Sequence, residues 1–206
     1  MTQRIRSARP VVFLIAFALV LGVGSAFAQT GKVVRISGTI ASISSGAITL
    51  TTADGSAKTA ALSAATVFLA SRDAALADIR AGDAMGVTAH RDAQGRLTAT
   101  VINIFPPELW SDPNMPRGQF PMDQPGQIMT NAVVTSLVSA TDGHTLTMRE
   151  KDLTTEIIVP DGTTINRLVM MKPVDLKTGM HVLIRGTQNT DGSIAAGAVT
   201  IVAGQG

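Results

Sequence analysis

The sequence contains no cysteine and no tyrosine, and aromatic residues make up only 3% of it. Without cysteine, the chain can be neither a disulfide-stapled domain nor a lipoprotein anchored through an acylated cysteine. Small barrels that bind single-stranded nucleic acid stack the bases on aromatic side chains in a basic groove. The shortage of rings therefore argues against nucleic acid as a ligand.

An excess of one charge is also lacking once the first residues are set aside. The chain has 17 lysines and arginines and 15 acidic residues, and three of the basic ones, Arg4, Arg6 and Arg9, precede an apolar run. Without that segment the chain is nearly neutral, so it has no positive field to attract phosphates or anionic lipid. We expect neither nucleic acid nor a membrane surface as a partner.

The amino-terminal segment has the pattern of an export signal. Its basic start is followed by the apolar run Val11–Gly22 and by Ser25-Ala26-Phe27-Ala28, which offers small residues where signal peptidase recognises them. The run is shorter than the roughly 20 residues that span a bilayer. We expect residues 1–28 to be a signal peptide cleaved after Ala28, and the mature protein to be periplasmic or secreted, with no membrane span left.

Motifs that carry catalysis or bind a cofactor are missing as well. The sequence shows no nucleophile elbow, no glycine-rich phosphate loop and no paired carboxylates in a plausible cleft. Its three histidines, His90, His144 and His181, are scattered, and no two have the spacing of a zinc site. The sequence therefore predicts no enzyme, no catalytic residue and no cofactor.

Methionine leaves one alternative open. Met115, Met122 and Met129 recur at intervals of seven, and Met170 and Met171 are adjacent. Thioethers combined with imidazole form a soft ligand set that suits copper, although methionine more commonly fills gaps in a core. A soluble periplasmic copper-binding protein is therefore the alternative to a metal-free one.

What the sequence does contain is an internal repeat. The pattern of about Val34–Ile104 returns at about Met129–Ile201. Its landmarks keep a constant spacing: Asp78 returns as Asp175, Gly82 as Gly179 and Gly95 as Gly192. A self-match of this size indicates one small fold used twice.

Each copy has the pattern of five or six short strands and one helical turn. Residues 73–79 have helix-like composition and precede Gly82, which suits a left-handed turn. The other apolar or β-branched runs predict strands: 33–43, 48–52, 57–62, 66–70, 83–89 and 97–104, then 131–138, 145–150, 154–159, 164–168, 180–186 and 193–202. Such an order is typical of a small closed barrel like the oligonucleotide- and oligosaccharide-binding (OB) fold. We expect an all-β protein with two tandem OB-like β-barrels, at residues 29–104 and 128–206.

A proline-rich connector, residues 105–127, lies between the copies. It holds six of the nine prolines, which predicts a semi-rigid extended segment without a helix or an internal strand. It also holds Phe105, Trp110 and Phe120. These rings either cover the end of a barrel or the seam between the barrels, which we favour, or contact another exported protein or envelope component.

Three motifs in the first copy carry a family resemblance. They are Gly38-Thr39-Ile40-Ala41-Ser42-Ile43, the stretch 77–83 around Asp78-Ile79, and Gly95-Arg96-Leu97-Thr98-Ala99. Together they resemble the exported bacterial domain of unknown function 5666, and the second copy, at 175–179 and 191–196, is similar to it too. The resemblance implies a small β-barrel and export, and no catalytic residues. The sequence thus predicts a periplasmic, non-enzymatic binding or scaffolding protein.

Overall fold

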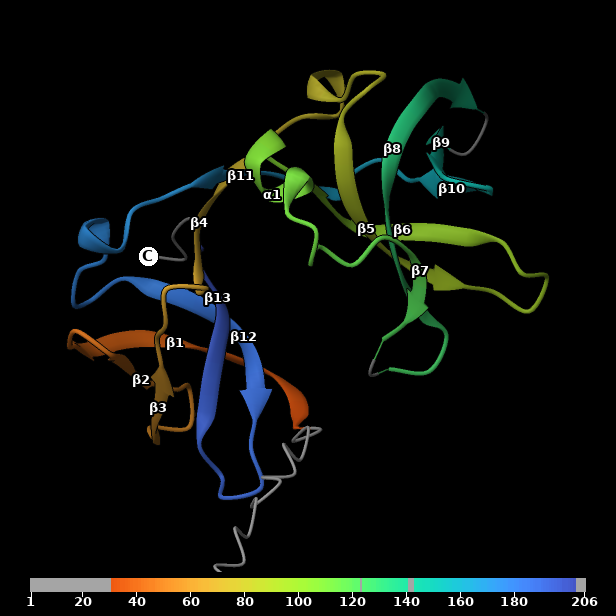
Figure 1. Cartoon of the computed structure of the whole chain (residues 1–206). Coiled ribbons are helices and arrows are strands. Elements are labelled where there is room, and N and C mark those ends of the chain that lie inside the picture. The colour runs from red at the N-terminus through yellow and green to blue at the C-terminus, as the bar shows by residue number, and fades with distance from the viewer. Residues whose placement is uncertain (1–30, 123, 141–142, 203–206) are drawn as a thin grey trace, which may run out of the picture.

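The computed structural model describes residues 31–122, 124–140 and 143–202, so the expected signal peptide lies outside the described residues. Strands dominate these residues, which confirms the all-β class (Figure 1). They are β1 (Lys32–Ile43), β2 (Ala47–Thr51), β3 (Ala57–Ala61), β4 (Val67–Asp73), β5 (Ala84–Arg91), β6 (Leu97–Ile104), β7 (Gly118–Pro121), β8 (Gln127–Ala140), β9 (Gly143–Glu150), β10 (Leu153–Val159), β11 (Thr164–Met170), β12 (His181–Gln188) and β13 (Ile194–Ile201).

The strands lie close to where the alternation of apolar residues predicts them. In β6, for example, Leu97, Ala99, Ile102 and Ile104 are buried, while Thr100 faces solvent. Successive side chains of a strand point to opposite faces, so such a pattern fixes which face enters the core. The change of phase within β6 coincides with a bulge in its pairing with β5, between Thr88 and Ala89.

The helical turn expected between the strands is present, but it is shorter than residues 73–79, which have helix-like composition. β4 continues to Asp73, and a single 3-10 turn, η1 (Leu76–Asp78), follows it. The Asp78 carboxylate accepts a hydrogen bond from the Ala75 backbone N–H at 2.8 Å and so closes this one turn. Ile79 is then extended and buried, which ends the turn. The corresponding turn η2 (Pro173–Asp175) precedes β12.

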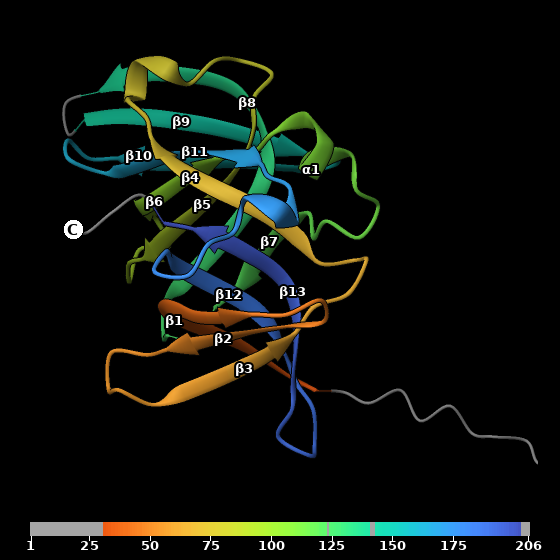
Figure 2. The ribbon, with the colours of Figure 1, turned by 90° about the vertical axis from the view of Figure 1, so that its left-hand side faces the viewer.

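All thirteen strands belong to one hydrogen-bonded sheet with two groups of strands. In one group, β8, β9, β10, β5 and β6 form a closed five-stranded barrel, because β10 also pairs with β6 at Ile158–Thr98. In the other group, β1, β2 and β3 join β12 and β13, and β3 meets β13 at Ala61–Ala195. Figure 2 shows β1–β3 near one end of the molecule and β8–β10 near the other.

Each group combines strands from both sides of the connector. β1 pairs with β12 over eight residue pairs, from Lys32–Gln188 to Thr39–His181, and β5 pairs with β8 in the corresponding way. Among the described residues, no ladder joins β1, β2 or β3 to β5 or β6. We call this arrangement the strand exchange. Two tandem barrels, each built by one copy at 29–104 or 128–206, are therefore not confirmed.

The hydrophobic cores follow the strand exchange. One core draws its buried side chains from residues 79–104 and 132–165, with Met85, Ile102, Leu146 and Met148 fully buried. The other draws them from residues 40–68 and 176–199. Both cores therefore need side chains from both sides of the connector. Each large apolar side chain contributes about 1.5–3 kcal/mol when it is buried, so neither half of the chain can complete a core without the other.

The connector contains regular structure that its prolines did not predict. Helix α1 (Pro107–Ser111) begins with a proline, which a helix tolerates at its first position because that N–H has no partner within the helix. β7 pairs with β8 alone and ends at Pro121, so it is an edge strand that needs no donor on its other side. The expectation of no helix was therefore wrong, whereas the expectation of no internal strand holds because β7 lies at an edge.

Candidate binding groove

The three aromatic side chains of the connector are all half-buried. Phe105 and Trp110 stack with their ring centroids 6.3 Å apart, and the Arg117 guanidinium lies over the Trp110 ring, 4.3 Å from its centroid. Phe120 belongs to β7 and pairs with Met129 of β8. The structure thus brings Phe105 and Trp110 together and places Phe120 separately on the sheet.

Hydrogen bonds fix the connector to β8. Asn131 Nδ2 donates to the Pro116 carbonyl at 2.8 Å, and Gln119 Nε2 donates to Thr130 Oγ1 at 3.1 Å. Asn131 and Thr130 are both buried, so the protein around them fixes these anchors. The stretch from α1 to β7 is therefore held in place as one wall of a hollow.

This hollow is a groove of about 900 Å³ between the connector and the outer face of β12 and β13. Leu109, Asp112 and Met115 line it from the connector, and Val33, Arg185 and Thr187 line it from β1 and β12. The start of β4 and the segment after β11 complete the walls. We call this hollow the connector groove.

The floor of the connector groove has small side chains. Gly197 and Ala198 of β13 lie there, next to a bulge between Arg185 and Gly186 of β12. A Cβ atom at Gly197 would meet only the Arg185 carbonyl oxygen, at 3.5 Å, which is ordinary van der Waals contact. The space above Gly197 is therefore open, and the backbone can be approached closely.

A second hollow of about 500 Å³ adjoins the connector groove, since Ser63, Ala64, Phe68 and Pro173 line both. Six large apolar side chains are exposed in the described residues, and four of them line these two hollows. The four are Val33 and Met170 in the connector groove and Ile43 and Val174 in the second hollow. Exposed apolar surface is thus concentrated in one place.

Among the described residues, Arg185 is the only basic one that lines the connector groove. In the part of the chain that the structure describes, no hydrogen bond or ion pair engages its guanidinium, and its direct cross-strand neighbour is Arg35. Partial desolvation and, to a smaller extent, the charge of Arg35 lower the pKa of Arg185. The acidic residue in the lining, Asp112, instead accepts two hydrogen bonds from Asn114, at 2.8 and 3.1 Å.

Methionines also meet in the connector groove, but not the series that the sequence singled out. Met115 lines it together with Met170 and Met171, whereas Met122 and Met129 do not. The Met129 sulfur instead lies 3.9 Å from Thr88 Oγ1, which donates to it. The strand exchange therefore selects a different set of thioethers from the spacing of seven.

None of the three histidines lines either hollow. His90 Nδ1 lies 3.2 Å from the Gly126 carbonyl, and the buried Nδ1 of His144 has no partner among the described residues. His181 Nε2 lies 3.1 Å from Ser37 Oγ, a pairing that β1 and β12 create across the chain. The Ser37 and His181 side chains are both exposed, and neither lines either hollow. In the described structure, no third group orients the His181 imidazole. A nucleophile needs such a group and a cleft.

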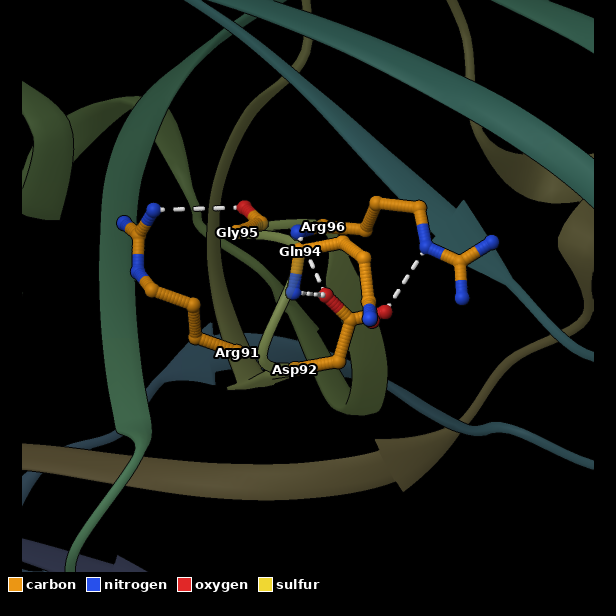
Figure 3. A network of polar contacts seen from close by, with 5 residues as sticks. All are labelled: Arg91, Asp92, Gln94, Gly95 and Arg96. Atoms are coloured by element: carbon orange, nitrogen blue, oxygen red, sulfur yellow. Dashed lines mark hydrogen bonds and ion pairs between the residues drawn. The ribbon is translucent and has the colours of Figure 1, made fainter.

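The turn between β5 and β6 carries a network of polar contacts (Figure 3). The Asp92 carboxylate accepts bonds from the Gln94 and Arg96 backbone N–H groups and from Arg96 Nε, the last at 2.7 Å. Arg91 donates to the Gly95 carbonyl. Although desolvation acts to raise it, the bonds from Arg96 keep the pKa of Asp92 below its usual value. The network stabilises the turn and leaves no group directed at a ligand.

Comparison with known proteins adds a family match for part of the chain. Residues 37–103 match the family model described as a domain of unknown function, DUF5666. This range runs from β1 to β6 and ends before the connector. No curated protein and no solved structure matches the chain. Within the described ranges, no helix is long and apolar enough to cross a membrane.

Proposed function

We propose that the protein is an exported, non-enzymatic binding protein whose ligand lies in the connector groove. The observation that carries this proposal is the concentration of exposed apolar side chains in and beside one hollow. Ligand sites are typically concave, mostly apolar, of roughly 300–1,000 Å³, and are often found where structural units meet. The connector groove matches this description in size, in lining and in its place between the connector and the sheet.

The floor of the connector groove provides a direct test. Gly197→Leu adds a side chain to the floor of the groove, where a Cβ atom would meet only the Arg185 carbonyl oxygen, so we expect it to fill the groove while the fold is retained. The control is Gly46→Leu, since a Cβ atom at Gly46 has no neighbour within 4 Å. We expect the neutral, environment-sensitive dye Nile red to bind to the wild type and to G46L, and to lose its fluorescence gain with G197L. Equal binding to both variants would remove the groove as the site.

Export is the second part of the proposal and rests on the pattern of residues 1–28. Mass spectrometry of the protein from the periplasm or the medium should find a chain that begins at Gln29. An intact Met1 terminus there would contradict it.

One specific observation favours copper as a second candidate ligand. Met115, Met170 and Met171 line the same groove, and thioethers are soft ligands for Cu(I). A ligand that binds only the folded state raises its melting temperature. If copper is the ligand, anaerobic titration with Cu(I) should raise the melting temperature of the wild type and not of Met115→Leu, with Met129→Leu as the control. An unchanged wild-type melting temperature would exclude copper.

A further inference from the structure

We propose that the ligand of the connector groove is a small aliphatic carboxylate, with its carboxylate bound by Arg185 and its chain lying over Gly197 against the methionines. This inference rests on the proposed function and assigns a chemical class to the ligand. It depends on three features of the groove: one cation without an anionic partner, a floor with small side chains, and flexible apolar walls.

The lining holds two charged residues, Arg185 and Asp112, and Asp112 accepts hydrogen bonds from Asn114. Arg185 is therefore the group in the lining that can bind an anion. Two arginines directly opposite each other in an antiparallel ladder repel, and Arg35 and Arg185 form such a pair. A guanidinium binds a carboxylate through two parallel hydrogen bonds. Since Arg185 is the only basic residue among the described residues of the lining, a single negative charge fits better than the two charges of a phosphate monoester.

The walls suit an aliphatic chain. Leu109, Val33 and the three methionines supply apolar surface, and unbranched methionine side chains adapt to a flexible ligand. In the described part of the lining, Phe68 is the only aromatic residue, and it is buried. A flat ring system, such as a nucleobase, would find no exposed aromatic side chain to stack on.

The volume limits the size of the ligand. About 900 Å³ corresponds to a site for a small molecule rather than to a protein interface. The neighbouring hollow, which shares Phe68 and Pro173 with the groove, extends the apolar surface for a longer chain. A small molecule with an acidic head and a hydrocarbon body therefore matches both hollows.

Competition with Nile red on the full mature chain tests the class of ligand. We expect decanoate to displace the dye from the wild type and decyltrimethylammonium to displace it poorly. Arg185→Gln should weaken decanoate about tenfold, because it removes the positive charge and one of the two parallel hydrogen bonds. Arg185→Lys, which retains the charge, should recover part of the affinity. The matched control is Arg149→Gln, an exposed arginine on β9 whose loss should change nothing.

The outcomes separate this inference from the proposed function. If Nile red is bound by the wild type and lost in G197L, the groove is a binding site. If decanoate then fails to compete, or competes equally with folded R185Q, or if the cationic amphiphile competes as well as decanoate, the carboxylate is the wrong ligand. If Nile red binds G197L as well as the wild type, both proposals fail together.

Discussion

At the residue scale, two glycines at turns of the chain take part in the strand exchange. Gly82 and Gly179 have φ angles of +93° and +89°, as the expected left-handed turn requires. The Gly82 N–H donates to the Val134 carbonyl, and the Gly179 N–H donates to the Ile40 carbonyl, both at 2.9 Å. Each glycine therefore turns the chain and bonds to a strand from the other side of the connector.

Replacing either glycine by alanine should destabilise the protein by about 1–3 kcal/mol, the cost of a residue held in a sparsely allowed backbone region. A Cβ atom at either position has no neighbour within 4 Å, so the effect is one of backbone strain alone. Gly46→Ala, with open space and no positive φ, is the control. Urea denaturation curves that coincide for G82A, G179A and the control would show that these turns bear no strain.

Asp54 should make the stability depend on pH at the acidic end. Hydrogen bonds from the Thr52 hydroxyl and from the Ser56 backbone and hydroxyl lower its pKa from 3.8 to about 2. Because the folded pKa lies below the unfolded one, the stabilisation is present above about pH 4 and is lost as the pH falls towards 2. Asp54→Asn should thus melt below the wild type at pH 7, with the difference shrinking towards pH 2. A difference independent of pH would mean that the carboxylate is not engaged.

At the element scale, the connector behaves as a docked segment rather than as a free linker. Its helix, its edge strand and its hydrogen bonds to β8 all place it against the sheet. Phe105 packs against Gly86, where an added Cβ atom would lie 2.6 Å from the ring. Proline density indicated a stiff segment, but only the complementary surface of β5 and β8 determines where it lies.

Trp110 is the only tryptophan, so its fluorescence reports on this docking. We expect native emission at shorter wavelength than in the unfolded protein, because the ring is half-buried between Phe105 and Arg117. Arg117→Ala should shift the native emission to longer wavelength, and Arg149→Ala should not. Emission typical of water, with rapid proteolysis between residues 105 and 127, would favour the reading of Phe105, Trp110 and Phe120 as a contact for an exported partner or envelope component.

At the scale of the whole molecule, the sequence predicted the strands but not their partners. Alternation of apolar residues tells which face of a strand is buried. It does not determine which strand pairs with β1, and in the structure that partner is β12 rather than β5. The turn glycines and the ends of β6 could be predicted because they depend on local sequence. The strand exchange could not be predicted because it depends on which distant strands pair.

The connector groove could not be predicted either. Its lining comes from Val33, Met115, Met170, Arg185 and Gly197, which are far apart in the sequence. Only the exchange of β12 and β13 and the docking of the connector bring them together. The methionine pattern was the one usable signal: it indicated Met115, Met170 and Met171, which line the groove, together with Met122 and Met129, which do not.

The strand exchange underlies the groove, and a disulfide tests it most directly, since the chain has no cysteine of its own. Val33 and Thr187 are cross-strand partners, at the spacing that a disulfide needs. His90 holds in β5 the place that Thr187 holds in β12. Oxidation of the dilute monomer should link the cysteines of Val33→Cys/Thr187→Cys and not those of Val33→Cys/His90→Cys, as read by peptide mass spectrometry. A link between positions 33 and 90, with none between 33 and 187, would contradict the exchange.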